Sequence, residues 1–214
     1  MPDFSALDLF QVTAFAIYAM LALISVVAVM VGLFKAIQFW RLGVGRWAKA
    51  ETILDDWLSG RPQEAVKAAA SHGSVLTRTL QAVFSGLQAQ PNNKTYAEEL
   101  GRQTANIELA ALMSRMRSLE MVVQSAPMLG LLGTVVGMID AFSAIAVSEG
   151  SVDPTQLASG IYTALTTTAV GLTVALIAFF IANWLEGRID RERQMLETLI
   201  SAAIYGRVSP TKRS

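Results

Sequence analysis

The sequence predicts an all-α membrane protein with three transmembrane helices, its N-terminus outside and its C-terminus inside. The second and third helices are expected to extend into the cytoplasm, where a helical domain accompanies them. Of the 214 residues, 53% are hydrophobic and only 16% are charged, which is more apolar than an ordinary soluble domain. Charged residues are almost missing from three long stretches, and every Lys and Arg lies outside these stretches.

The three stretches poor in charge cover residues 9–34, 121–148 and 154–185. The first and third contain no charged residue, and the second contains only Asp140. About 20 apolar residues are enough for a helix to cross the hydrocarbon core, and lipid forces the backbone to satisfy its own hydrogen bonds. Each stretch is therefore predicted to be a transmembrane helix. The first lacks a preceding basic segment and a small-residue cleavage site, so we expect it to be retained.

Lys and Arg set the predicted orientation. Eleven of the 17 lie between Lys35 and Arg117, and six lie between Arg188 and Arg213. By the positive-inside rule both segments are cytoplasmic. The predicted order is an outer N-terminus (1–11), a first span (12–34), a cytoplasmic helical domain (35–120), a second span (121–148), an outer turn (149–154), a third span (155–185) and a cytoplasmic C-terminal helix and tail (186–214).

Turn-forming residues divide the cytoplasmic segment into helices. The stretch "GRWAKAETILDDWLSG" is predicted to be a short helix that ends at Gly60, and Pro62 opens the next helix. Gly73 separates that helix from a third, which has apolar residues at helical spacing. Residues 102–126 contain neither Gly nor Pro, so the second span is predicted to continue a cytoplasmic helix without interruption. The third span should likewise continue, because about 32 uncharged residues at about 1.5 Å each exceed a core of about 30 Å.

The composition excludes several function classes. Without cysteine the chain has no disulfide framework and no thiolate metal site. His72 is the single histidine and is expected to be a solvated surface residue. The sequence therefore offers no Ser/His/Asp set for nucleophilic catalysis. The glycines of "GLLGTVVGM" lack the Gly-Lys-Ser/Thr ending of a phosphate loop. We expect no enzyme activity, no cofactor, no metal and no nucleic-acid partner.

Polar residues within the predicted spans are candidates for an ion path, because such residues are costly in lipid and usually face protein or water. The run "TTT" at 166–168 includes Thr167 and Thr168 and covers about 200° of a helix, so its members cannot all face one pore. A threonine can instead bond back to its own helix. Both interpretations stay open for each threonine.

The glycines of the second span favour helix packing over direct contact with an ion. Gly130, Gly133 and Gly137 are spaced three and four residues apart, which allows close approach of another helix. Pro127 removes one backbone hydrogen bond and is expected to kink this helix.

Asp140 permits two interpretations. The span could end just before it, which would leave the carboxylate in the outer headgroup region. Against this, residues 141–147 continue apolar for two more turns. A carboxylate at that depth requires water, a cation or a hydroxyl partner.

Three segments resemble the TolQ/ExbB/MotA proton-channel family, and most closely its ExbB and TolQ members. The stretch "APMLGLLGTVVGMIDAF" is similar to the second-span signature of the family, and "GIYTALTTTAVGLTVAL" is similar to the third-span signature. The stretch "GRPQEAVKAAASHGSVLTRTLQAVFSGL" resembles the helical pair that follows the first span. MotA-like members have four spans, which argues against the flagellar branch.

The resemblance implies a subunit of a motor in the bacterial inner membrane, with the outer side facing the periplasm. Such subunits form a homopentamer around two copies of a single-span ExbD- or TolR-like partner, and the proton-motive force then energises a TonB- or TolA-like protein. By motif match, Thr134 and Thr168 correspond to the threonines that line the aspartate of this partner, and Gly171 belongs to the third-span motif as a packing glycine. The ExbB role is preferred, with a TolQ-type envelope motor or a passive scaffold as alternatives.

The chain departs from the family at one position. Many members have a glutamate in the third span where this chain has Thr163, which leaves proton and sodium both open as the ion. Asp140 lies six residues outward of Thr134, about 9 Å, and Thr163 lies five residues outward of Thr168, about 7.5 Å. We hypothesise that the carboxylate has moved from the third helix to the second.

Overall fold

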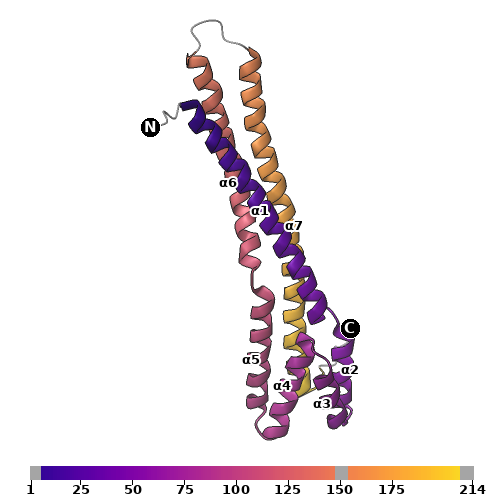
Figure 1. Cartoon of the computed structure of the whole chain (residues 1–214). Helices are drawn as coiled ribbons and strands as arrows, with labels where there is room; N and C mark the ends of the chain where they lie inside the picture. Colours follow the sequence, from indigo (N-terminus) through magenta and orange to yellow (C-terminus); the bar gives the residue numbers. More distant parts are fainter. Residues whose placement is uncertain (1–5, 148–153, 208–214) are drawn as a thin grey trace, which may run out of the picture. The chain divides into compact units, whose positions relative to one another are not determined.

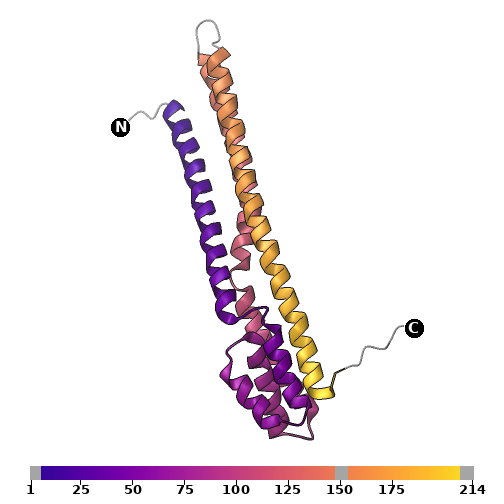
Figure 2. The same ribbon diagram turned by 90° about the vertical axis from the view of Figure 1, so that its right-hand side faces the viewer.

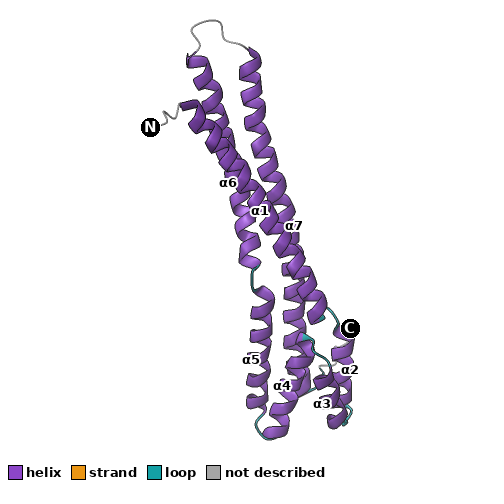
Figure 3. Ribbon diagram, viewed as in Figure 1, coloured by secondary structure: helices purple, strands orange, loops and turns teal. Residues whose placement is uncertain are grey.

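The structure is a computed structural model, and it describes residues 6–147 and 154–207. Within these ranges it contains helices and loops but no strands (Figure 3). The helices are α1 (Ala6–Leu42), α2 (Trp47–Leu58), α3 (Pro62–Ser71), α4 (Val75–Ala89), α5 (Lys94–Met113), α6 (Met116–Val147) and α7 (Pro154–Tyr205). Three helical stretches, which include α1, α6 and α7, are long and apolar enough to cross a membrane. The prediction of an all-α membrane protein is confirmed.

The chain forms two compact units. The first contains Met1–Leu33 and Arg115–Asn183, so it holds most of α1, all of α6 and the first part of α7. The second contains Phe34–Ser114 and Trp184–Ser214, so it holds the end of α1, the helices α2 to α5 and the rest of α7. The outer turn predicted at residues 149–154 lies almost wholly outside the described residues.

In the first unit, α6 and α7 run antiparallel and side by side (Figures 1 and 2). Small residues fill the space between them, while large apolar side chains point outward. Phe15, Met128 and Phe180 are 75%, 70% and 62% exposed. Exposure of such side chains on three apolar helices is what a lipid environment requires, because lipid tails solvate them as well as a protein core does.

The second unit has a conventional apolar core built on α4. Leu76, Leu80 and Phe84 are buried on one face of this helix, and the Phe84 ring stacks on Trp57 of α2 with 4.2 Å between ring centroids. The spacing of these residues, four apart, belongs to the amphipathic pattern that predicted the helix. Val83, which belongs to the same pattern, packs against α5 next to Gly101.

The short helices α2, α3 and α4 begin and end near the residues that predicted their limits. Helix α2 ends two residues before Gly60, which has a φ of +80°, a value that favours glycine. Helix α3 begins at Pro62. Helix α4 follows Gly73, and the side chain of its N-cap Ser74 accepts a hydrogen bond from the backbone N–H of Thr77.

The prediction of an uninterrupted helix through residues 102–126 is wrong. Helix α5 ends at Met113 and α6 begins at Met116, and Arg115 between them has a φ of +64°. Side chains from α1 satisfy the last carbonyl groups of α5. Lys35 Nζ donates to the Leu112 carbonyl at 2.5 Å, and Gln38 Nε2 donates to the Ala111 carbonyl at 3.1 Å.

Lys35 shows why this helix end is stable. Its side chain is fully buried, so its charge needs partners. The carbonyl end of a helix carries partial negative charge and interacts well with a cation. The α1 side chains therefore replace the hydrogen bonds that a continued α5 would have made, and no glycine or proline is needed.

A buried carboxylate joins α7 to the loop after α1. Glu192 is fully buried, and its Oε2 accepts hydrogen bonds from the Gly45 backbone N–H at 3.1 Å and from Trp47 Nε1 at 3.2 Å. Burial raises the pKa of the Glu192 carboxyl, although these two hydrogen bonds and nearby Arg188 act in the lowering direction. Because the folded-state pKa is the higher one, the contribution of this group to stability is fully present below its ordinary pKa and is lost as the pH rises through the raised value.

Candidate functional site

Small residues bring α6 and α7 into close contact along a line that we call the seam, which includes Gly130, Gly133 and Gly137 of α6 and Gly171 of α7. A Cβ atom added at Gly130 would lie 3.0 Å from the Thr168 Cα, and one added at Gly137 would lie 3.0 Å from the Ala164 Cβ. At Gly171 an added Cβ would lie 2.6 Å from the Ala126 carbonyl oxygen. The structure thus places three of the predicted packing glycines where the two backbones approach each other.

Gly133 is the fourth glycine of the seam, and it faces Thr167. A Cβ at Gly133 would lie 2.5 Å from the Thr167 hydroxyl oxygen. Thr167 is only 4% exposed, and its hydroxyl donates to the Ala164 carbonyl of its own helix at 2.6 Å. Of the threonines singled out in the sequence, Thr167 therefore lies within the helix pair and not on its surface.

Thr168 forms a hydrogen bond that links the two helices. Its Oγ1 donates to the Gly130 carbonyl at 2.9 Å. The Thr134 hydroxyl donates to the Leu131 carbonyl of its own helix at 2.7 Å. Each donated proton leaves the hydroxyl oxygen with acceptor capacity for a water, a cation or a protonated carboxyl group.

Helix geometry places Thr134 and Thr168 on the same flank of the pair. We call the rotation from one residue to the next along a helix positive, and it is about 100° per residue. In this sense each threonine lies about 55° from the centre of the seam residues on its own helix. Because the two helices are antiparallel, equal rotational senses point to the same side. The two threonines also lie within about two residues of each other in depth, since Gly133 is opposite Thr167. The two residues therefore lie on one flank at similar depth.

Asp140 and Thr163 lie on the opposite flank. Each is rotated in the negative sense from its seam, by about 65° and about 85° respectively. Contacts between Ala141 and Gly160 set their depth, which differs by about 3–5 Å. Asp140 is half-buried, whereas Thr163 is exposed and bonds back to the Ser159 carbonyl at 2.9 Å. Asp140 and Thr163 therefore share one flank of the helix pair, and Thr134 and Thr168 share the other.

The flank of Asp140 and Thr163 is also the one on which α1 packs. Ile181 follows Thr163 by 18 residues, which is five full turns, so the two side chains share one face of α7. A Cβ added at Gly32 of α1 would lie 3.4 Å from the Ile181 side chain. The threonine flank is thus turned away from this contact with α1.

Helix α6 passes through Pro127 without a break. The residue lies one position after Ala126, whose carbonyl touches Gly171 in the seam. Ser125, two positions before Pro127, donates its hydroxyl proton to the Met121 carbonyl at 2.6 Å. The backbone around the proline therefore forms part of the contact between the two helices.

The sequence interpretation missed part of the seam. Gly160 lies so close to α6 that an added Cβ would be 2.5 Å from the Ala141 Cβ, and Ala164 is 1% exposed. The signal was present, because small residues at 160, 164, 167 and 171 recur every three or four positions on α7. Among the described residues, no group of three or more His, Asp or Glu side chains could hold a metal ion.

An antiparallel pair of apolar helices, long enough to span a membrane and packed through glycine, defines an α-helical membrane protein. The comparison with family models makes the class specific. Residues 68–198 match the model of the MotA/TolQ/ExbB proton channel family, and the chain belongs to this family.

Curated relatives are similar to this chain over part of its length. A "Putative biopolymer transport protein ExbB homolog" of Methanothermobacter thermautotrophicus is 32% identical over 124 residues, which are 58% of this chain and 43% of the relative. "Biopolymer transport protein exbB1" of Vibrio cholerae is 42% identical over 84 residues, which are 39% of this chain and 37% of the relative. "Biopolymer transport protein ExbB" of Aquifex aeolicus is 30% identical over 138 residues, which are 64% of this chain and 88% of the relative. The chain spans less than half the length of the first two.

Proposed function

We propose that this chain is a non-enzymatic, ion-conducting subunit of a membrane motor that couples the proton-motive force to biopolymer transport. In this proposal it forms a homopentamer in the bacterial inner membrane around two copies of an ExbD- or TolR-like partner. The motor then energises a TonB- or TolA-like protein. The names of the relatives favour the ExbB role over the TolQ role, and membership of a proton channel family favours conduction over a passive scaffold.

The observation that carries the proposal is the shared flank of Thr134 and Thr168. Two hydroxyl oxygens at similar depth offer acceptors to a proton-carrying carboxyl group or to a chain of waters. The Thr168 bond to Gly130 fixes one of them relative to both helices. An open apolar hollow of about 660 Å³, lined by residues that include Val135, Met138 and Phe142, borders Thr134. Its lining suits an apolar single-span helix.

The test is ion flux through the complex of this chain with its single-span partner in liposomes. Thr134→Val and Thr168→Val each remove a hydroxyl and keep the volume of the side chain. We expect each to reduce partner-dependent proton flux by tenfold or more, measured with an internal pH-sensitive dye. Parallel measurements in a sodium gradient identify the ion.

Thr173→Val is the matched control. Thr173 is an exposed residue of α7, it bonds back to the Ala169 carbonyl at 2.8 Å, and it points away from α6. The control should conduct like the unmodified chain. Equal flux in all three variants would show that the threonine flank does not line the ion path.

A further inference from the structure

A small basic pocket lies in the second unit, where α1 ends. Its volume is about 120 Å³, and its walls come from the end of α1, the following turn, α2 and the first turn of α4. The polar side chains that line it are Arg41, Arg46, Lys49, His72, Ser74 and Thr77.

The pocket concentrates positive charge without compensation from its own walls. None of its lining residues carries a carboxylate. Among the ion pairs between described residues, none includes Arg41, Arg46 or Lys49, whereas Arg61 pairs with Asp56 at 2.6 Å. Cations that surround a concave, partly dehydrated space attract an anion more strongly than cations spread over a convex surface.

The turn after α1 holds Arg46 at the pocket. Gly43 has a φ of +64°, and a Cβ added there would lie 3.2 Å from the Arg46 Cδ and 3.5 Å from the Ser74 Cβ. The stem of Arg46 and the N-cap residue Ser74 of α4 therefore both lie next to Gly43. The N-terminal end of α4 adds partial positive charge to that of the side chains.

His72 and Thr77 close the pocket on the side of α4. The Thr77 hydroxyl donates to the His72 carbonyl at 2.6 Å, which fixes the loop between α3 and α4. His72 is half-buried and its Nδ1 lies 3.0 Å from the Ala68 carbonyl, so it is not the freely solvated residue expected from the sequence. The ring is a wall of the pocket.

The pocket lies close to the end of the apolar part of α1. Helix α1 continues without a break from the apolar run to Leu42, so Arg41 is about 10 Å beyond Phe34 along the axis. The headgroup layer is about 5–8 Å thick on each side, within reach of a long basic side chain. Trp40 is 76% exposed and Ile37 is 55% exposed, and exposed tryptophan is typical of the membrane interface.

We propose that this pocket binds the phosphate group of an anionic phospholipid in the leaflet at this end of α1. A volume of about 120 Å³ equals about four waters at about 30 Å³ each, which accommodates a phosphate group but no acyl chain. The acyl chains lie outside the pocket, along Ile37 and Trp40. Free inorganic phosphate has the same charge chemistry, but it makes no use of this exposed apolar surface.

The experiment measures lipid retained by the purified full chain, solubilised in a neutral detergent and titrated with phosphatidylglycerol. Native mass spectrometry counts the bound lipids per chain. We expect phosphatidylglycerol to be retained at least tenfold more than phosphatidylcholine. The variant with Arg41→Ala, Arg46→Ala and Lys49→Ala should lose this preference.

A second triple variant with Arg61→Ala, Lys94→Ala and Arg102→Ala removes the same charge from residues that do not line the pocket, and it should keep the preference. The residues changed in both variants are exposed, and circular dichroism checks that the helices persist. Equal lipid retention by the two triple variants would overturn the proposal, because attraction would then depend on net charge alone.

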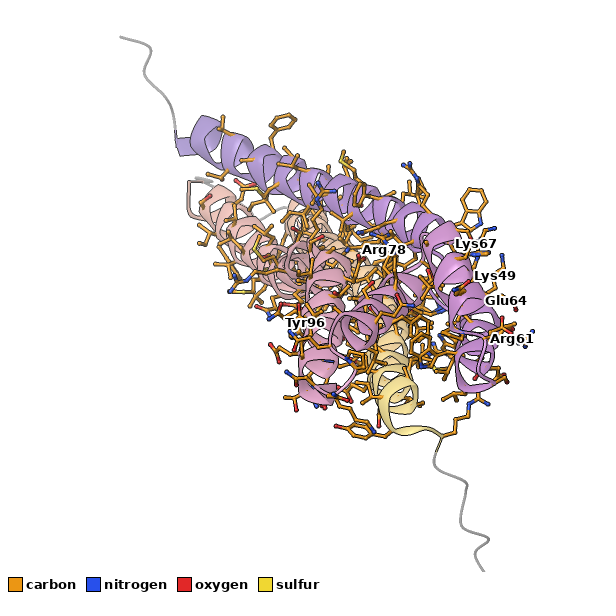
Figure 4. All side chains as sticks on the ribbon, turned by 90° about the horizontal axis from the view of Figure 1, so that it is seen from below. Lys49, Arg61, Glu64, Lys67, Arg78 and Tyr96 are labelled. Carbon is orange, nitrogen blue, oxygen red and sulfur yellow. The ribbon has the colours of Figure 1, made fainter. Side chains whose placement is uncertain are left out.

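A single charge reversal provides an independent measurement. Lys49→Glu (Lys49 is labelled in Figure 4) places a carboxylate at the pocket, and it should reduce phosphatidylglycerol retention at least fivefold. Lys94→Glu, the same change at the start of α5, should have no effect. Full displacement of the lipid by a roughly hundredfold excess of inorganic phosphate would identify free phosphate as the ligand and overturn the lipid assignment.

Discussion

Asp140 is the single acidic residue in the stretch predicted as the second span, and it lies outside the flank that carries Thr134 and Thr168. It shares a side of the helix pair with Thr163, the position at which the family resemblance led us to expect a glutamate. We propose that this half-buried carboxylate supplies, from α6, the charge that α7 lacks. The two positions differ by only about 3–5 Å in depth.

Whether the Asp140 carboxylate takes the place of a glutamate at position 163 can be tested by moving the carboxylate from one position to the other. Asp140→Asn removes the charge with little change in volume, and we expect it to reduce partner-dependent ion flux by tenfold or more. Adding Thr163→Glu to the same chain returns a carboxylate to that flank from α7 and should restore most of the flux. The liposome assay described above measures both variants.

The outcome separates the two interpretations of Asp140. Unchanged flux in Asp140→Asn would mean that the residue plays no part in conduction and that the carboxylate has not moved to α6. Loss of flux without recovery in the double variant would mean that the position on α6 itself matters, and not the shared flank.

Helices α6 and α7 show how small residues determine a contact between elements. Backbone atoms approach each other at Gly171, where no side chain could move to make room. By contrast, an added Cβ at Gly187, on the same helix, would meet no atom within 4 Å. The two glycines have the same local helix propensity, so only their tertiary surroundings differ.

This pair of glycines gives a prediction for stability. Gly171→Ala should force the helices apart and destabilise the protein by about 1–3 kcal/mol, the usual range for overpacking. Gly187→Ala should stabilise it by about 0.5–1 kcal/mol, because alanine is the better helix former. The thermal unfolding midpoint in detergent, followed by circular dichroism, measures both changes. A lower unfolding midpoint for Gly187→Ala than for Gly171→Ala would contradict the close packing of α6 against α7 at Gly171.

At the scale of the whole molecule, the distribution of basic residues predicts which ends of the spans face the cytoplasm. Because the chain contains no cysteine, a single introduced cysteine reports on its own position. In cells whose outer membrane is permeabilised and whose inner membrane is intact, Glu149→Cys should react with a membrane-impermeant thiol reagent. Ser59→Cys, in the turn after α2, should react only after the inner membrane is also opened. Reaction of Ser59→Cys in intact cells would reverse the predicted orientation.

The sequence alone determined the fold class, the three apolar stretches and the family resemblance. Helix limits near Gly60, Pro62 and Gly73 were also predictable, because capping and turn preferences act over a few neighbouring residues. Burial in lipid likewise depends on local composition, so it can be recognised from a single stretch of chain.

Only the tertiary structure decided which residues meet across the chain. The end of α5 at Met113 depends on Lys35 and Gln38 from α1, which no local pattern at residues 102–126 reveals. The separation of Thr134 and Thr168 from Asp140 depends on which face of each helix packs against the other. Side-chain contacts between distant segments set both features, and a sequence pattern records only the preferences of the single segment in which it occurs.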